Sequence, residues 1–131
     1  MIYNLNSLGI DHLNPMQEEM LQQVRRNESV VLLSPTGSGK TLGYLLPVVE
    51  NMQQATVPTV LVLVPSRELA IQTQGVAQKL CCELKSYACY GGRPAMDEHR
   101  AMRMIMPQLI VGTPGRILDH IKKGNFPCHA I

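Results

Sequence analysis

The chain has 131 residues, of which 45% are hydrophobic and 17% are charged, and its formal net charge is +2. This length and composition are typical of one globular domain with a single core. The net charge is too small to indicate a nucleic-acid partner by itself, so any basic surface has to be local. No apolar run approaches membrane length, and the first residues lack the basic start of a signal peptide. We therefore expect a cytoplasmic protein that has no membrane partner.

The cysteines and histidines do not form a metal-binding pattern. The sequence has no C-x-x-C pair, and no histidine stands at zinc-binding spacing from a cysteine. We therefore expect reduced cysteines, which are typical of an intracellular protein, and histidines that lie on the surface. The histidines are His12, His99, His120 and His129.

The first clear helix signal is Asn14 followed by Pro15. Asparagine is a preferred N-cap, and proline is favoured at the first helical position. Apolar side chains at positions 16, 20, 21 and 24 then share one face, and the helix should end near residue 26.

Residues 30–33, Val-Val-Leu-Leu, predict a strand that is buried on both faces of a sheet. Residues 34–41 follow and read Ser-Pro-Thr-Gly-Ser-Gly-Lys-Thr. Apolar residues then recur at helical spacing, in a helix that Pro47 should kink. A strand, a glycine-rich loop and a helix N-terminus in this order make a phosphate cradle.

Within this cradle, Lys40 is expected to reach the β- and γ-phosphates of a nucleotide, and the Thr41 hydroxyl to ligate Mg²⁺. The general P-loop pattern has glycine where this chain has Ser34. The alternative is a strand-to-helix turn that is rich in glycine and binds nothing. The flanking strand and helix favour the phosphate-binding interpretation.

Strands and helices alternate along the rest of the chain. The predicted strands cover residues 59–64, 87–90 and 109–111, and the predicted helices cover residues 67–84, 96–104 and 116–123. The strands are apolar throughout, so we expect an α/β fold in which helices cover both faces of a parallel sheet, in three layers.

Ligands of such sheets gather at the carboxyl ends of the strands, where four loops rich in Gly, Pro, Ser or Thr occur here. An arginine stands beside three of these loops: Arg67, Arg93 and Arg116. Each arginine alone would be interpreted as a solvated charge or a helix-end salt bridge. Their repetition at three successive strand ends favours a site for a run of phosphates.

Taken together, these segments resemble the first RecA-like domain of the DEAD-box RNA helicases. Residues 14–17, Asn-Pro-Met-Gln, with Gly9 and Ile10 upstream, are similar to the Q motif, and residues 34–41 are similar to motif I, in which alanine is common at the position of Ser34. The resemblance implies that ATP binds with Mg²⁺, and that Gln17 reads the adenine. The implied nucleotide ligands are Gln17, Ser34, Pro35, Thr36, Gly37, Ser38, Gly39, Lys40, Thr41 and Leu42; Lys40 and Thr41 are the implied catalytic residues, and Thr41 the implied metal ligand.

Three further segments resemble the RNA-binding motifs of that family. Residues 65–70 resemble motif Ia, with serine at position 66 in place of the usual threonine. Residues 91–92 resemble the family's double glycine, and residues 113–116 resemble motif Ib. The resemblance implies sugar-phosphate contacts to single-stranded or duplex RNA. The implied RNA ligands are Pro65, Ser66, Arg67, Gly91, Gly92, Thr113, Pro114, Gly115 and Arg116.

The chain departs from the family pattern in two places. The aromatic residue that usually stacks on adenine would fall before Met1, so that this contact is lost or Tyr3 replaces it. The sequence ends at Ile131, short of the expected Asp-Glu-Ala-Asp motif. We therefore expect residues 1–131 to be the N-terminal part of the first RecA-like domain, without the second domain.

Three functions remain open at this point. The first is the ATP-binding half of an ATP-dependent RNA helicase, and the second is a non-catalytic nucleotide- or RNA-binding module. The third, a small-molecule kinase, does not explain the arginine-bearing loops at the later strand ends. We also expect that the chain alone does not hydrolyse ATP, because it lacks an acid to orient water, and that unpaired strands cause it to self-associate.

Overall fold

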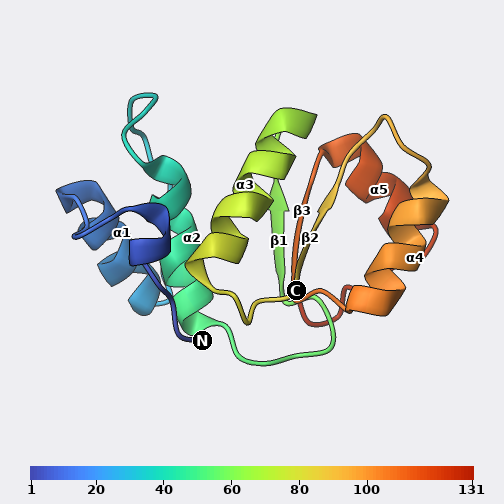
Figure 1. The fold of residues 1–131 in the computed structure, drawn as a ribbon, viewed down its shortest axis with the longest axis horizontal. Helices are drawn as coiled ribbons and strands as arrows, with labels where there is room; N and C mark the ends of the chain where they lie inside the picture. Colours follow the sequence, from blue (N-terminus) through green and yellow to red (C-terminus); the bar gives the residue numbers. More distant parts are fainter.

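A parallel sheet of three strands lies in the middle of the molecule, with helices on both of its faces (Figure 1). The structure is a computed structural model and describes residues 1–131. The predicted three-layer α/β fold is confirmed. None of the helices combines the length and the apolar character that a membrane span requires.

All five predicted helices and three of the four predicted strands are present. In chain order the elements are η1 (Asn6–Leu8), α1 (Pro15–Arg25), α2 (Lys40–Asn51), β1 (Val60–Leu63), α3 (Arg67–Leu80), β2 (Ser86–Cys89), α4 (Ala95–Ile105), β3 (Leu109–Gly112) and α5 (Pro114–Lys122). Helix α2 continues through Pro47. Helix α3 is shorter than predicted, because the chain is extended at Cys81.

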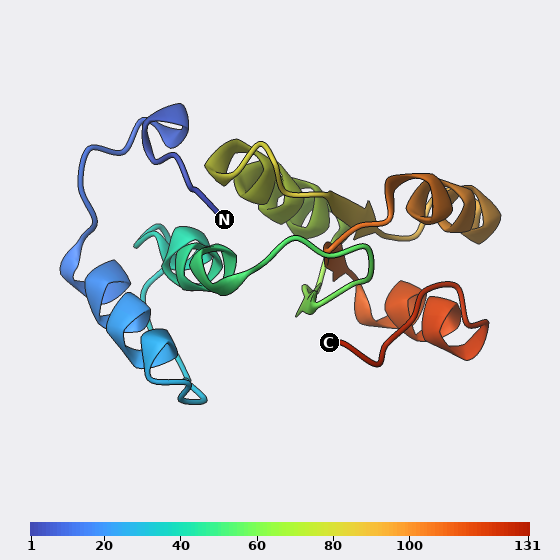
Figure 2. The same ribbon diagram turned by 90° about the horizontal axis from the view of Figure 1, so that it is seen from below.

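The central strand, β3, pairs in parallel with β1 on one side and with β2 on the other. Its side chains alternate between the two faces of the sheet. Leu109 and Val111 join the larger core of 14 buried residues with α2 and α3, whereas Ile110 joins a smaller core with α4 and α5. Figure 2 shows these two groups of helices on opposite sides of the strands. Burial on both faces explains why β3 is apolar throughout.

The strand predicted over residues 30–33 is not formed. Val31 and Leu33 are 87% and 90% exposed, and these four residues make no backbone hydrogen bond. A cleft of about 580 Å³, which Val30 and Leu32 line from one side and β1 lines from the other, separates them from the sheet. A strand requires a hydrogen-bonded neighbour, and no segment of this chain fills the cleft. The prediction is therefore wrong for this structure, although the segment has a strand-like sequence.

Two side-chain predictions also need correction. Leu69 has helical spacing to Val76 and Leu80, which predicts that it faces inward, but it is 39% exposed and lines the clefts beside α2. His120 was expected on the surface, but it is completely buried. Its burial follows from a carboxylate that lies opposite its ring.

That carboxylate belongs to Glu98, which is completely buried on α4. It accepts hydrogen bonds from Tyr90 N at 2.9 Å, Arg93 Nε at 2.9 Å, Arg116 Nη1 at 3.0 Å and His120 Nε2 at 2.8 Å. Burial by itself raises the pKa of Glu98, but these hydrogen bonds, with that from His120 the largest, together lower it below its usual range. One side chain therefore connects the end of β2, α4 and α5.

The unpaired edge of β1 and the exposed residues 30–33 predict that the chain self-associates. Light scattering over a concentration series should show a rising mean mass. Leu33→Lys should lower that mass, because a charge at the edge opposes strand pairing. Leu118→Lys, at a 50% exposed position on α5, should leave it unchanged. A concentration-independent monomer for the unsubstituted chain would contradict this prediction.

The lowered pKa of Glu98 predicts a loss of stability in acid. Since the pKa of Glu98 is lower in the folded state than in the unfolded chain, the stabilisation is complete above the unfolded-state pKa and is lost as the pH falls through the folded-state pKa. Urea unfolding below pH 5 should show this decline, and Glu98→Gln should flatten it. Glu50→Gln, which removes an exposed ion pair with Arg25, should flatten it less, because solvent screens that pair. Equal flattening by the two variants would count against the assignment.

Candidate functional site

The loop before α2 leaves a set of backbone donors free. Gly39 precedes the helix with φ +87°, a conformation that glycine adopts without strain. The N–H groups of Gly37, Gly39, Lys40 and Thr41 donate to no other group of the chain. Free N–H groups at a helix N-terminus attract anions, since they add to the positive end of the helix dipole. The loop therefore fits a phosphate group.

The Lys40 ammonium folds back over this loop and donates to the Ser34 carbonyl at 2.8 Å. The Ser34 hydroxyl in turn is hydrogen-bonded to the Ser38 hydroxyl. Lys40 can thus exchange one carbonyl for a phosphate oxygen without a large movement. Thr41 lines the clefts on both sides of the helix start, and no Asp or Glu lines either cleft. The Thr41 hydroxyl at the helix start is an oxygen donor of the kind that a magnesium ion takes, and its role as a metal ligand stays a prediction.

The capping residues at the start of α1 hold the phosphate loop through hydrogen bonds. Asn14 and Gln17 form a reciprocal capping box, with Asn14 Oδ1 accepting from Gln17 N at 2.9 Å and Gln17 Oε1 accepting from Asn14 N at 3.0 Å. The amide nitrogens of the same two side chains donate to Ser38 O at 3.0 Å and to Gly39 O at 3.2 Å. The Q-motif residues therefore hold the phosphate loop in place.

Gln17 is only 6% exposed, and both polar ends of its amide are engaged inside the chain. The amide still keeps a second N–H and a second lone pair, which are the groups that adenine would need. Its adenine-reading role stays a prediction. Tyr3, the candidate for stacking on adenine, packs against the larger core. It does not line the cleft that lies between the phosphate loop and α3.

A cleft of about 690 Å³ adjoins the phosphate loop, and this size is typical of small-molecule sites. The loop and the start of α2 form one wall, and the opposite wall comes from the segment around η1 and from α3. The side chains of the opposite wall are mostly apolar: Leu8, Ile10, Leu69, Gln72 and Val76. The cleft thus joins a polar phosphate end to an apolar end.

The structure brings the three predicted RNA loops together. Arg67, in the first turn of α3, reaches the double glycine: a Cβ on Gly92 would lie 2.7 Å from Arg67 Nη1. Gly92 also has φ +93°, a conformation that favours glycine, whereas the long and exposed Arg67 side chain could move away from a Cβ. Arg67 is exposed and forms no ion pair, which leaves its charge available.

The loop after β3 is connected to the same double-glycine loop. Arg116 Nη2 donates to the Arg93 carbonyl at 2.9 Å, while Arg116 Nη1 donates to Glu98. Arg93 and Arg116 are thus partners in an internal network, in contrast to Arg67. The N–H groups of Gly91, Gly92, Gly115 and Arg116 have no acceptor in the chain, and the Thr113 side chain does not cap α5. Backbone donors therefore face outward from both loops.

The other predicted RNA ligands occupy the same edge. Ser66 caps α3 by accepting from Leu69 N at 3.2 Å, so its hydroxyl already has a structural role. Pro65 and Pro114 are exposed beside the loops. Helix α3 lies between the two regions, because its first residue touches Gly92 while Leu69 and Gln72 line the cleft of the phosphate loop.

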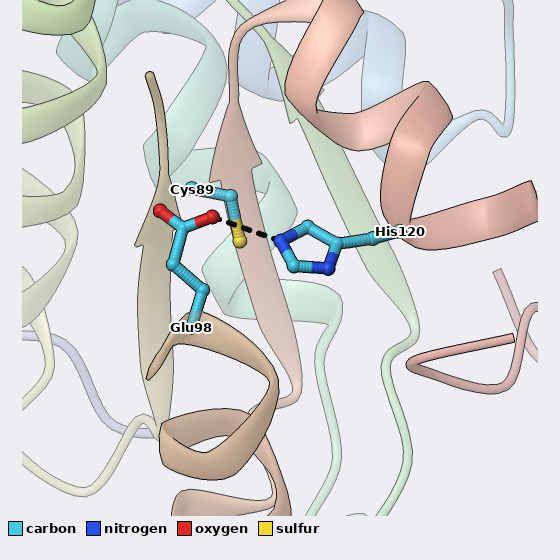
Figure 3. Close-up of side chains that lie close together, drawn as sticks. All are labelled: Cys89, Glu98 and His120. Atoms are coloured by element: carbon cyan, nitrogen blue, oxygen red, sulfur yellow. Dashed lines mark hydrogen bonds and ion pairs between the residues drawn. The ribbon is translucent and has the colours of Figure 1, made fainter. Parts of the chain in front are cut away.

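Cys89, Glu98 and His120 place ligand-type atoms within 4.8 Å of one another (Figure 3). Metal binding there would require a thiolate, but burial, with a smaller effect of the Glu98 charge, raises the pKa of Cys89 to about 12. The Glu98 oxygens already accept from four donors, two of them arginines. A cation would have to displace those positive groups. The chemistry of this cluster is therefore that of a structural hydrogen-bond network.

Sequence reasoning missed Glu98. A signal was present, because Glu98 stands four residues before Met102 and shares its face of α4, and both are buried. A carboxylate on the buried face of a helix requires basic partners, and the arginines at the two neighbouring loops were the candidates.

Comparisons with known proteins agree with this geometry. The family model described as DEAD/DEAH box helicase matches residues 14–130. The chain is 38% identical over 126 residues to the ATP-dependent RNA helicase DeaD of Escherichia coli strain K12, covering 93% of this chain and 20% of that protein. It is 36% identical over 131 residues to the probable ATP-dependent RNA helicase YfmL of Bacillus subtilis, covering 98% of this chain and 35% of the relative.

Two solved structures are similar to the whole arrangement. A hypothetical ATP-dependent RNA helicase from Sulfolobus tokodaii matches with a TM-score of 0.80 and 28% identity, over 93% of this chain and 35% of that one. The yeast DEAD-box splicing factor Prp28 matches in fold, with a TM-score of 0.84 and 22% identity, over 97% of this chain and 32% of that one. The family model covers most of the chain, and its match includes the phosphate loop and all three strand-end loops. The chain therefore belongs to the DEAD/DEAH box helicase family.

Proposed function

We propose that this chain is the ATP-binding and RNA-contacting part of an ATP-dependent RNA helicase that unwinds or remodels RNA duplexes. The observation that carries the proposal is that the three strand-end loops meet at one edge of the sheet, where Arg67 lies against Gly92 and Arg116 donates to the Arg93 carbonyl. The chain spans 19% to 35% of the length of the curated relatives it matches, which are named as RNA helicases. The activity of the whole protein is thus part of the proposal.

For the nucleotide, the free N–H groups of the loop and Lys40 would hold the phosphates of ATP. Thr41 would hold a magnesium ion, which when bound neutralises phosphate charge. Ser34, Pro35, Thr36 and Ser38 shape the loop around these donors, and Leu42 lines the adjoining cleft. Gln17 would distinguish adenine, from its position against Gly39.

RNA would be held through its phosphate and sugar groups. The groups that would bind them are the free N–H groups of the double-glycine loop and of the loop after β3, the Thr113 hydroxyl and the charge of Arg67. Contacts of this kind fix the path of a strand and carry no base specificity. The chain has one Phe and no Trp, so base stacking on aromatic side chains is a poor alternative for gripping single strands. The proposed RNA partner is therefore recognised by its sugar-phosphate backbone.

A second candidate describes these 131 residues alone, as a module that binds nucleotide and RNA without turnover. Phosphoryl transfer requires an oriented water and charge stabilisation around the transferred group. The absence of Asp and Glu from the clefts beside Thr41 favours this description of the isolated chain. In the intact helicase, the remaining groups would come from a second RecA-like domain and from other segments outside these residues.

Adenine reading can be tested by calorimetry with ATP and GTP in the presence of Mg²⁺. The unsubstituted chain should bind ATP about fivefold more tightly than GTP, because one net hydrogen bond contributes about 1 kcal/mol. Gln17→Ala should remove this preference. Asn14→Ala is the control: it removes the bond to Ser38 and the cap on Gln17 N, but it keeps the two backbone groups that hold the Gln17 amide. It should weaken the binding of both nucleotides while keeping the ratio of their affinities. Equal affinity of the unsubstituted chain for ATP and GTP would refute adenine reading.

RNA binding can be tested by titrating single-stranded RNA at several salt concentrations. Arg67→Ala should weaken binding and reduce the slope of log K against log salt by about 0.7, the value for one phosphate contact to a single strand. Arg26→Ala removes the same charge from the exposed C-cap of α1, away from the strand-end loops, and should leave the slope unchanged. RNAs of different base composition should bind alike. A strong preference for one sequence, or an affinity that ignores salt, would argue against this site.

A further inference from the structure

We propose that Glu98 is a positioning residue for RNA: it holds Arg116 and the double-glycine loop in one fixed arrangement. This inference rests on the proposed RNA-binding function. Glu98 lies on α4, outside every segment to which the family motifs assign a ligand. Its side chain is completely buried, so it acts on RNA only through the groups that it holds.

The hydrogen bonds of Glu98 account for all of its acceptor capacity. An ionised carboxylate has about four lone-pair sites, and here one oxygen accepts from Tyr90 N and Arg93 Nε, while the other accepts from Arg116 Nη1 and His120 Nε2. The donors belong to two different strand-end regions. A single carboxylate therefore fixes the distance between the loop after β2 and the start of α5.

Arg93 strengthens the same connection. Its Nη2 donates to the Ala88 carbonyl, and its guanidinium lies 4.1 Å from the centre of the Tyr90 ring. The side chain is thus fixed on three sides, and its own carbonyl accepts from Arg116. The double-glycine loop and the N-terminus of α5 are consequently cross-linked by Arg93, Glu98 and Arg116.

Arg116 remains able to contact a phosphate from this fixed position. Its side chain is 16% exposed, and two of its five N–H groups are used by Glu98 and by the Arg93 carbonyl. A planar guanidinium that is held by two acceptors loses little freedom when it binds a third. The geometry therefore favours an arginine that is oriented before RNA arrives.

Positioning and simple electrostatics predict opposite results when Glu98 loses its charge. If Glu98 only adds a negative charge near the phosphates, Glu98→Gln should strengthen RNA binding, since the net charge rises by one. If Glu98 positions Arg116, the variant should weaken binding, because an amide nitrogen would face the guanidinium donors and would turn Arg116 away. The sign of the change distinguishes the two explanations.

The experiment measures the affinity of the 131-residue chain for single-stranded RNA and, separately, for ATP. Glu98→Gln should weaken RNA binding roughly tenfold, as the loss of one charge-assisted contact implies, and should leave ATP affinity unchanged. Arg116→Lys, which keeps the charge but cannot reach both acceptors, should weaken it similarly. The double variant should be weaker by much less than the product of the two, because both changes break the same connection.

Unchanged or tighter RNA binding by Glu98→Gln would overturn the proposal, and so would an equal loss of ATP affinity, which indicates a general folding defect. If Glu98→Gln does not fold, Glu98→Asp decides the question, because it keeps the charge but is one methylene too short to hold all four donors. Full RNA affinity of Glu98→Asp overturns the proposal, and weaker RNA binding with intact ATP binding supports it. Arg67→Ala distinguishes a failure of the positioning role of Glu98 from a failure of the proposed RNA-binding function. Weakening by Arg67→Ala without weakening by Glu98→Gln overturns positioning alone, whereas an unsubstituted chain that binds no RNA overturns the proposed function with it.

Discussion

The pairing of β3 with both of its neighbours is the constraint on which the rest of the structure depends. In a parallel sheet, all strands end at the same edge, so the loops after β1, β2 and β3 have to meet there. Side chains of β3 hold a different core on each face, which fixes α3 on one side and α4 and α5 on the other. Three loops that are far apart in the sequence thus become one surface with free backbone donors.

Helix α3 gives this surface a physical connection to the phosphate loop. Its first residue, Arg67, contacts the double-glycine loop, and its next turn, with Leu69 and Gln72, lines the cleft beside Lys40. A helix moves largely as a rigid unit, so a shift at one end is felt at the other. Coupling between nucleotide and RNA would require two arrangements of this helix, each favoured by one ligand. The observed contacts identify the element that such coupling would have to move.

Local features of the chain could be predicted from the sequence, and features that need a distant partner could not. Helix caps such as Asn14 with Pro15, apolar runs and glycine loops depend on neighbouring residues, and the structure has them where they were expected. Residues 30–33 have a strand-like sequence, but pairing depends on a neighbour that this chain does not place beside them. The hydrogen-bond partners of Glu98 lie 5 to 22 residues away from it in the chain, so no single segment of the sequence predicts this network.

Two glycines show how the motifs act on one another as well as on a ligand. Gly39 and Gly92 both have positive φ, and each lacks a Cβ where a side chain from another motif packs: Gln17 lies against the first, and Arg67 against the second. Any other residue would be strained in that backbone conformation, and its Cβ would displace the end of the neighbouring side chain. The glycines thus let these side chains approach the backbone closely. For this reason, the Q motif and the phosphate loop, like motif Ia and the double glycine, behave as joined pairs, and a substitution in either partner should disturb both.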